Sequence, residues 1–176
     1  LESASAFAPE NDDIRMDLVQ ILKKRQKFGK AHALASELAE RQPDKPVIKS
    51  MLAIETMQIG RHAEACALFD EVLENYPNDP ATLVSKGHAL KTMGSDDEAV
   101  LSYQAAARYN PLLGDAWFSL SNLKTHKFSD DEIQTMQAAL THPAINHLSL
   151  VNIHFALGKA FEDKGQYERA FRHSDD

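Results

Sequence analysis

The segment Pro80–Leu113, PATLVSKGHALKTMGSDDEAVLSYQAAARYNPLL, decides the fold of this chain. Its small and apolar residues recur at helical spacing in two runs, which meet at Gly94. Gly94 can adopt the backbone that ends a helix, and the polar Ser95 and Asp96 that follow it suit the start of another. Pro111 ends the second run because proline has no amide hydrogen with which to continue a helix. The segment therefore predicts two antiparallel helices joined by a tight turn.

Small residues in both runs indicate that the two helices pack closely. Gly87 on the first and Ala99 on the second would let side-chain ridges and grooves interlock. The segment resembles a 34-residue tetratricopeptide repeat, TPR. The residues that carry this resemblance are Leu83, Gly87, Leu90, Gly94, Ala99, Tyr103, Ala106 and Pro111. A single hairpin of this kind cannot bury its apolar face, so the resemblance implies neighbouring repeats.

The same period continues towards the N-terminus. Repeats at residues 12–45, 46–79 and 80–113 follow one another without a gap. Each contains a closing proline and a small residue on its second helix, which are Pro43, Pro77 and Pro111, and Ala31, Ala65 and Ala99. The first repeat departs from the pattern, with Val19 at a small-residue position and Gln26 in place of the turn glycine. We expect residues 1–11 to form a flexible leader.

Two less regular repeats follow, a degenerate one at 114–150 and a truncated one at 151–176. Trp117, Leu120 and Leu123 fit the first helix of the fourth repeat, with Trp117 at a core position. Ser129 and Glu132 form a capping box, which predicts a helix over residues 130–140. The fifth repeat begins at Val151, three residues later than the period requires. We expect residues 12–176 to form one TPR domain and the natural protein to continue beyond Asp176.

The repeats predict an all-α fold, a right-handed α-solenoid of stacked TPR helix-turn-helix hairpins. Five repeats, the last one truncated, correspond to about ten helices. Each hairpin is expected to be stabilised mainly by its nearest neighbours along the chain.

Two strings in the C-terminal half carry a more specific resemblance. They are AWFSLSNLKTHKFSDDEI at 116–133 and HFALGKAFEDKGQYERAF at 154–171. In this order they resemble the last repeats of bacterial TPR-containing sulfotransferases, and the resemblance covers roughly residues 110–172. In that family the repeats precede a catalytic domain that transfers a sulfuryl group from PAPS. The chain contains no Gly-rich phosphosulfate-binding loop, so no catalytic residue can be assigned.

Composition argues against several classes of function. The net charge of -7 disfavours nonspecific binding to nucleic acid, which relies on a basic surface. No apolar run approaches the roughly 20 residues that span a bilayer, so we expect no membrane role. The single cysteine, Cys66, excludes an internal disulfide framework and fits a packing position on a second helix. A reducing, cytoplasmic location is expected.

The sequence shows no catalytic, cofactor-binding or metal-binding motif. Its eight histidines are scattered without the spacing of a zinc site. Paired acidic residues, such as Asp96 and Asp97, fall in first helical turns, where they complement the helix dipole. The prediction is therefore a fragment that is not an enzyme and requires no cofactor.

The remaining candidate site is a groove lined by the first helices of the repeats. TPR geometry implies that certain positions on these helices face the groove and can bind a peptide or a neighbouring domain. Here they include Val47 and, as the proposed site, Ile54, Met57, Val84, His88, Lys91, Phe118, Asn122, Phe155 and Lys159. We predict that Met51, Ile54 and Met57 lie outside the positions at which the repeats pack together. The alternative is that these side chains pack adjacent first helices together.

Two functions remain open at this point. The first is a non-catalytic protein-interaction module, the N-terminal part of a sulfotransferase-like protein that binds a protein segment or its own downstream catalytic domain. The second is a free-standing TPR scaffold, or an assembly or chaperone-type adaptor that binds peptides in its groove. The sequence after Asp176 would distinguish them.

Overall fold

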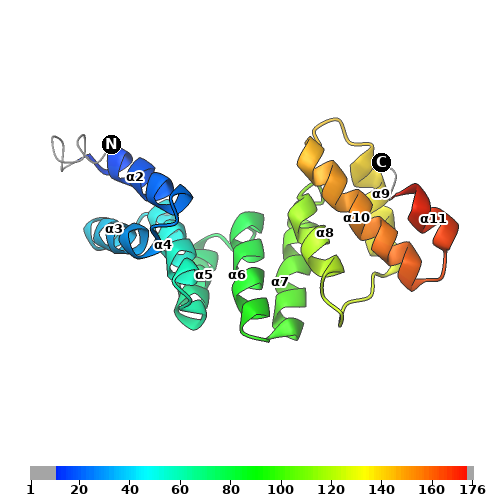
Figure 1. Ribbon diagram of the computed structural model, residues 1–176, viewed down its shortest axis with the longest axis horizontal. Coiled ribbons are helices and arrows are strands. Elements are labelled where there is room, and N and C mark those ends of the chain that lie inside the picture. The colour runs from blue at the N-terminus through cyan, green and yellow to red at the C-terminus, as the bar shows by residue number, and fades with distance from the viewer. Residues whose placement is uncertain (1–10, 174–176) are drawn as a thin grey trace. The chain divides into compact units, whose positions relative to one another are not determined.

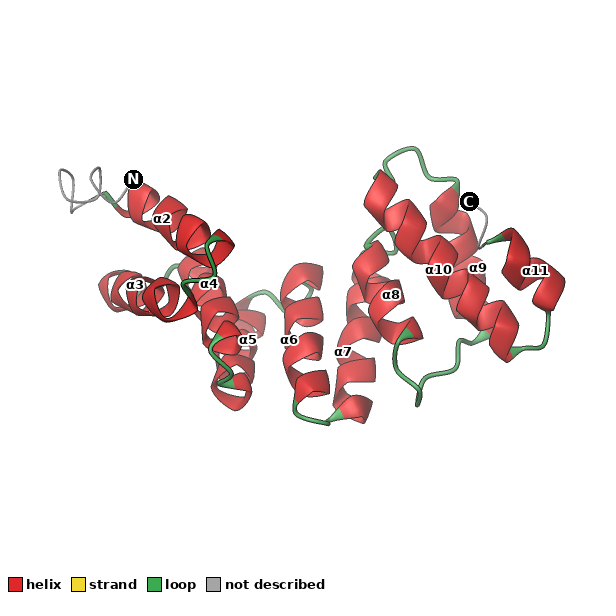
Figure 2. Cartoon of the chain, in the orientation of Figure 1, coloured by secondary structure: helices red, strands yellow, loops and turns green. Residues whose placement is uncertain are grey.

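A computed structural model describes residues 11–173 of the chain, which contain ten helices and no strand (Figures 1 and 2). The predicted leader at residues 1–11 lies outside the described residues except for Asn11. The Asn11 side chain accepts hydrogen bonds from the backbone amides of Asp13 and Ile14 and so caps the first helix. The chain divides into two compact units, Leu1–Pro77 and Asn78–Asp176.

The first unit contains two helical hairpins. Helices α2 (Asp12–Lys24) and α3 (Phe28–Arg41) form the first, and α4 (Pro46–Gln58) and α5 (His62–Asn75) form the second. Each helix packs on the next one along the chain. Their buried faces form two apolar clusters, one containing Leu18, Val19, Leu22, Ala31, Ala35, Leu38, Ile48 and Met51, the other Ala53, Ala65 and Phe69. Cys66 is buried on α5, in keeping with its predicted packing role.

The second unit contains six helices: α6 (Pro80–Thr92), α7 (Asp96–Tyr109), α8 (Gly114–Ser121), α9 (Asp130–Leu140), α10 (His147–Asp163) and α11 (Tyr167–Arg172). Helices α6 and α7 pair, α8 packs on α7 and α10, and α10 also packs on α9 and α11. The largest fully buried side chains of this unit are Tyr103, Leu120, Met136, Ile153, Leu157 and Phe161. Helix α10 therefore contacts α8, α9 and α11 and connects the helices in the second half of this unit.

Four hairpins share one turn geometry. The second residue after the first helix has a left-handed backbone, at Gln26 (φ 57°), Gly60 (φ 85°), Gly94 (φ 80°) and Gly165 (φ 71°). The next amide donates to a carbonyl five residues earlier, as in Ser95 N to Leu90 O at 3.0 Å. This hydrogen bond closes the helix end as in a Schellman motif. Gln26 therefore occupies the predicted glycine position in the same conformation, even though its Cβ makes that conformation less favourable.

The fourth repeat lacks this turn. Helix α8 ends at Ser121, so Leu123 follows the helix instead of belonging to it as predicted, although it is buried. A loop, 122–129, then leads into α9. Its Phe128 packs against Trp117, whose indole Nε1 donates to the carbonyl of Pro111 at 2.9 Å. Trp117 is thus a core residue, as predicted, and the loop fills the space next to it.

Helices α9 and α10 start at polar caps. Both hydrogen bonds of the predicted capping box are present, from Glu132 N to Ser129 Oγ and from Ser129 N to Glu132 Oε2. Helix α9 spans the predicted residues. Helix α10 begins at His147, four residues before the predicted repeat start at Val151. The reason is that the Asn146 side chain accepts the Ser149 amide at 2.8 Å and caps an additional turn.

Gly87 makes the closest contact within the α6–α7 hairpin. A Cβ at this position would lie 2.5 Å from Cε1 of Tyr103, and the Tyr103 side chain is fully buried. The ring therefore lies against the bare backbone of α6. This contact explains why the sequence places its small residue there.

Two carboxylates, the buried Glu55 and the half-buried Glu132, have opposite environments. Glu55 on α4 is fully buried, and neither of its oxygens has a hydrogen-bond partner among the described residues. Desolvation raises its pKa, although the ammonium of Lys23, 3.9 Å away, partly opposes the shift. An ionised Glu55 therefore opposes folding of its unit.

Glu132 is stabilised in its charged form. Burial alone would raise its pKa, but the nearby His126 ring and the hydrogen bonds from the Ser129 amide and the Gln104 side chain lower it to about 2. The Gln104 amide lies 3.0 Å and His126 Nε2 3.4 Å from Oε1. Glu132 thus connects α7, the 122–129 loop and α9.

We predict that Gly87→Ala destabilises the protein by roughly 1–3 kcal/mol, because the fully buried Tyr103 ring has little room to move away from the added methyl group. Gly29→Ala is the matched control, since a Cβ there meets nothing within 4 Å and alanine favours a helix. Urea unfolding followed by circular dichroism measures both. Equal midpoints for Gly87→Ala and the parent would contradict the packing described here.

Glu55 and Glu132 should give opposite pH dependences. Glu55→Gln removes an unfavourable buried charge, so it should stabilise the protein at neutral pH, and the gain should disappear below the ordinary pKa of 4.5. Glu132→Gln should destabilise it at neutral pH, and the loss should shrink as pH falls from 4.5 towards 2. Unfolding midpoints at several pH values test both signs. Glu40→Gln, which alters an exposed carboxylate, is the control.

Candidate functional site

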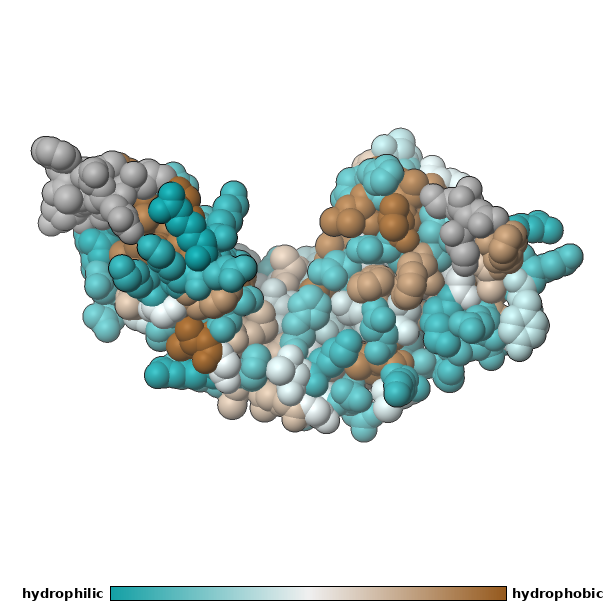
Figure 3. Space-filling view, in the orientation of Figure 1, coloured by the Kyte–Doolittle hydropathy of each residue, from teal (hydrophilic) through white to brown (hydrophobic). Residues whose placement is uncertain are grey.

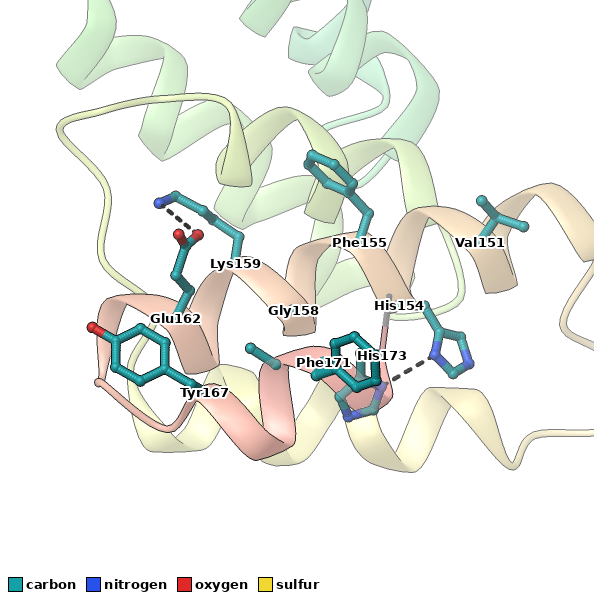
Figure 4. Close-up of a pocket in the computed structure, with 10 residues that line it drawn as sticks. Val151, His154, Phe155, Gly158, Lys159, Glu162, Tyr167, Phe171 and His173 are labelled. Carbon is teal, nitrogen blue, oxygen red and sulfur yellow. Dashed lines mark hydrogen bonds and ion pairs between the residues drawn. The ribbon is translucent and has the colours of Figure 1, made fainter. Parts of the chain in front are cut away.

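A concave surface lies between α10 and α11 in the second unit (Figure 4). It is an open cavity of about 610 Å³. Figure 4 shows Val151, Phe155 and Lys159 spaced along α10, with Tyr167 and Phe171 contributed by α11. The remaining lining residues are His154, Gly158, Glu162, Ala170 and His173. The lining is mainly apolar with a few charged groups, which suits a segment of another polypeptide.

Phe118 and Phe155 form an exposed aromatic pair next to this cavity. Their ring centroids lie 5.1 Å apart at an interplanar angle of 54°, within the range that aromatic pairs prefer. Phe118 on α8 remains 36% exposed and Phe155 on α10 remains 52% exposed. Figure 3 shows hydrophobic side chains gathered over α8 and the beginning of α10. Two residues that the sequence singled out separately are therefore neighbours.

The predicted polar residues around the pair have defined partners. Lys159 Nζ lies 3.0 Å from Asp163 and 3.4 Å from Glu162, and hydrogen bonds to these carboxylates raise its pKa. The Asn122 amide donates to the carbonyl of Phe118 at 2.8 Å, so Asn122 helps to end α8. Lys159 thus presents a cation beside Phe155, whereas the Asn122 side chain already has a structural hydrogen bond.

Three predicted residues on α6 have different environments. His88 Nε2 lies 3.1 Å from Ser119 Oγ on α8, and burial lowers the His88 pKa. Lys91 is exposed. Val84 is only 5% exposed, so the expectation that it offers an apolar surface is wrong, because packing already encloses it. The His88–Ser119 contact and the Phe118–Phe155 pair therefore link α6, α8 and α10.

The predicted residues of the first unit lie on α4. Ile54 and Met57 are partly buried against the cluster formed by Ala53, Ala65 and Phe69, which accords with the alternative that they contribute to packing. Met51 is 9% exposed and belongs to the larger cluster of this unit, so its assignment as unneeded for packing is wrong. Val47 is 59% exposed.

Sequence reasoning missed the contribution of α11 to the cavity. Tyr167 is 71% and Phe171 66% exposed, and they stand four residues apart on one helix. Tyr167 and Phe171 fall within the string at 154–171, but neither was included in the predicted groove. The spacing of two aromatic residues on the last helix was the available signal for this surface.

We also searched the described residues for clusters of metal ligands and for membrane-spanning helices. Within 11–173, no group of three or more His, Cys, Asp or Glu side chains is arranged to hold a metal ion. Over the same residues, no helix has the length and apolar character required to span a bilayer.

Comparison with protein families supports the repeat assignment. The model of the family described as "Psidin, N-terminal TPR repeats region" matches residues 2–141 of this chain. Two curated proteins are similar to most of this chain, but the similar region is a small part of each of those proteins. An uncharacterized protein of Aquifex aeolicus (strain VF5) is 26% identical over 135 residues, or 77% of this chain, and mouse "Protein O-mannosyl-transferase TMTC1" is 22% identical over 123 residues, or 68%. The chain spans 17% and 13% of these relatives, respectively.

Solved structures of MamA share the fold. "MamA 41-end from Desulfovibrio magneticus RS-1" superposes with a TM-score of 0.65 at 20% identity, covering 93% of this chain and 90% of that one. A second structure, "Crystal structure of MamA", gives a TM-score of 0.64 at 17% identity and covers 89% and 90% of the two chains. Together with the packing of helix on helix within each unit, these similarities confirm the predicted all-α solenoid class.

Proposed function

The chain belongs to the family of the Psidin N-terminal TPR repeats region, and from this premise we propose that it is a non-catalytic protein-interaction module. TPR repeats, together with the surface described above, support a scaffold that binds another polypeptide. The binding surface that we propose consists of Phe118, Phe155 and Lys159 with the adjoining wall of the α10–α11 cavity.

The exposed aromatic pair is the observation that carries this proposal. Two phenylalanine rings in contact retain 36% and 52% of their surface in water, where apolar area is costly to expose. A partner segment that covers both rings would remove that area from water. Lys159 and Glu162 border the same cavity and could fix the register of the segment through charge. The expected partner is therefore an extended peptide with apolar side chains and at least one charged group.

The finer proposal concerns the longer protein. The strings at 116–133 and 154–171 support an N-terminal TPR region of a sulfotransferase-like protein, in which the downstream catalytic domain would occupy the surface. One similar protein is itself named as a transferase, and the chain matches only 13% of its length, which supports repeats of this kind being joined to a group-transfer enzyme. The alternative is a free-standing TPR scaffold or chaperone-type adaptor. A cytoplasmic location belongs to the same proposal.

Truncation of Phe118 should weaken partner binding. We predict that Phe118→Ala lowers affinity for a bound peptide by about 1–3 kcal/mol, because it removes one ring of the pair. Helix content should remain at the parent level, since Phe118 is partly exposed. The assay is fluorescence titration with a panel of apolar peptides of both charge signs. Leu101→Ala, which removes a 66% exposed side chain from the second helix of a hairpin, is the control.

Two outcomes would contradict the proposed surface. One is an unchanged affinity in Phe118→Ala for every peptide that the parent binds. The other is a comparable loss in Leu101→Ala, which would place the contact on the second helices. Parent protein that binds no peptide in the panel would argue against the extended-peptide form of the proposal.

The sulfotransferase proposal has its own test. We predict that the residues following Asp176 in the natural protein contain a strand and a Gly/Ser/Thr-rich phosphate-binding loop, and that the isolated chain 1–176 gives a flat calorimetric titration with PAPS. Sequencing and titration measure the two parts. A stop codon or a further TPR repeat after Asp176 would favour the free-standing scaffold, and saturable PAPS binding by 1–176 would reveal a donor site within the chain.

A further inference from the structure

Two histidines face each other at the end of the second unit. His154 lies on α10 and His173 directly follows α11, and their Nδ1 atoms are 3.1 Å apart (Figure 4). Nineteen residues separate them in sequence, so no short motif announces the pair. We propose that His154 and His173 form a binding site for a divalent transition-metal ion that prefers imidazole ligands, such as Zn²⁺.

The separation of the two nitrogens suits one shared ion. Zinc–imidazole bonds are about 2.0–2.1 Å long. Two such bonds to nitrogens 3.1 Å apart enclose an angle of roughly 95–102° at the metal. This angle lies near the tetrahedral value that zinc prefers, and copper and nickel accept angles close to 90°. The ion would lie beside the line that joins the two nitrogens, so both rings would turn about their side-chain bonds to aim their lone pairs at it.

Neighbouring side chains hold one ring in place. The His173 ring stacks on Phe161 with centroids 5.6 Å apart and an interplanar angle of 17°. Phe161 is itself almost fully buried on α10, and the Arg169 guanidinium lies over its ring at 4.0 Å. His154 projects from the middle of α10, where the helical backbone limits its rotamers. Ordered ligands bind a metal more tightly because less side-chain freedom is lost.

The proton arrangement is compatible with coordination. In the pair as it stands, one Nδ1 donates and the other accepts a hydrogen bond. A metal requires lone pairs on both Nδ1 atoms, which each neutral ring provides when its proton is on Nε2. The donor ring therefore changes tautomer by exchanging its Nδ1 proton with water.

Within residues 11–173, His154 and His173 are the two side chains that we assign as ligands, and no third His, Cys, Asp or Glu joins them in a ligand cluster. Both histidines line the cavity between α10 and α11, which is open enough to admit an ion from solvent. The ion would connect the residue that ends α11, a helix of only six residues, to the middle of α10. Binding should therefore hold α11 against α10.

Calorimetric titration of the chain with ZnCl₂ tests the site. We expect one saturable zinc site, with an affinity that His154→Ala and His173→Ala each reduce at least about tenfold, because each leaves a single imidazole. His147→Ala removes an exposed histidine from the same helix and should bind zinc like the parent. Hydrogen exchange at residues 167–172 should slow with zinc in the parent and in His147→Ala only. His154→Gln provides a second variant if an alanine substitution disturbs folding.

The result that overturns the proposal is a zinc isotherm in His154→Ala or His173→Ala that matches the parent. Absence of saturable binding in the parent would overturn it as well. An equal loss in His147→Ala would assign the ion to other histidines. None of these outcomes depends on whether the chain binds a peptide, so the zinc site and the proposed function can fail separately.

Discussion

The structure depends on a constraint at the end of the first helix of each regular hairpin. One residue there must adopt a left-handed backbone, so that the next amide can reach back to a carbonyl five residues earlier. The turn reverses the chain within three residues and brings the two helices side by side. Close packing, such as that of Gly87 against Tyr103, then becomes possible. Glycine meets this constraint at three positions, and Gln26 meets it at the fourth despite its side chain.

The candidate surface is found where this regularity is lost. The fourth hairpin has no left-handed turn, its first helix is short, and a loop with Phe128 fills the adjoining space. Charged contacts compensate for the missing turn. Glu132 binds partners from α7 and from the loop, and Lys127 on the loop lies 2.9 Å from Asp163 at the end of α10. These contacts leave Phe118 at the edge of α8, where it meets Phe155.

The last hairpin differs from the preceding ones in the surface that it leaves exposed. Val84 on α6 is enclosed, whereas Phe155, the residue at the corresponding position of α10, is half exposed. Tyr167 and Phe171 on α11 extend the same apolar surface. A partner segment and a metal ion held by His154 and His173 would use different parts of one cavity, the aromatic edge and the end of α11. The proposals about peptide and metal binding therefore concern neighbouring but separable groups.

The sequence by itself determined the helical hairpins of this protein, because the 34-residue spacing of small residues, turn glycines and prolines reflects local backbone requirements. It also identified Trp117 as a core residue and the capping box that starts α9, since both follow from short-range patterns. Phe118 and Phe155 were identified as candidates by their helical positions. Only the tertiary structure decided that these two rings touch, that Val84 is enclosed, that α10 gains a turn, and that His154 meets His173. Burial and contact between residues distant in sequence depend on how whole helices pack, and that packing is not encoded at any single position.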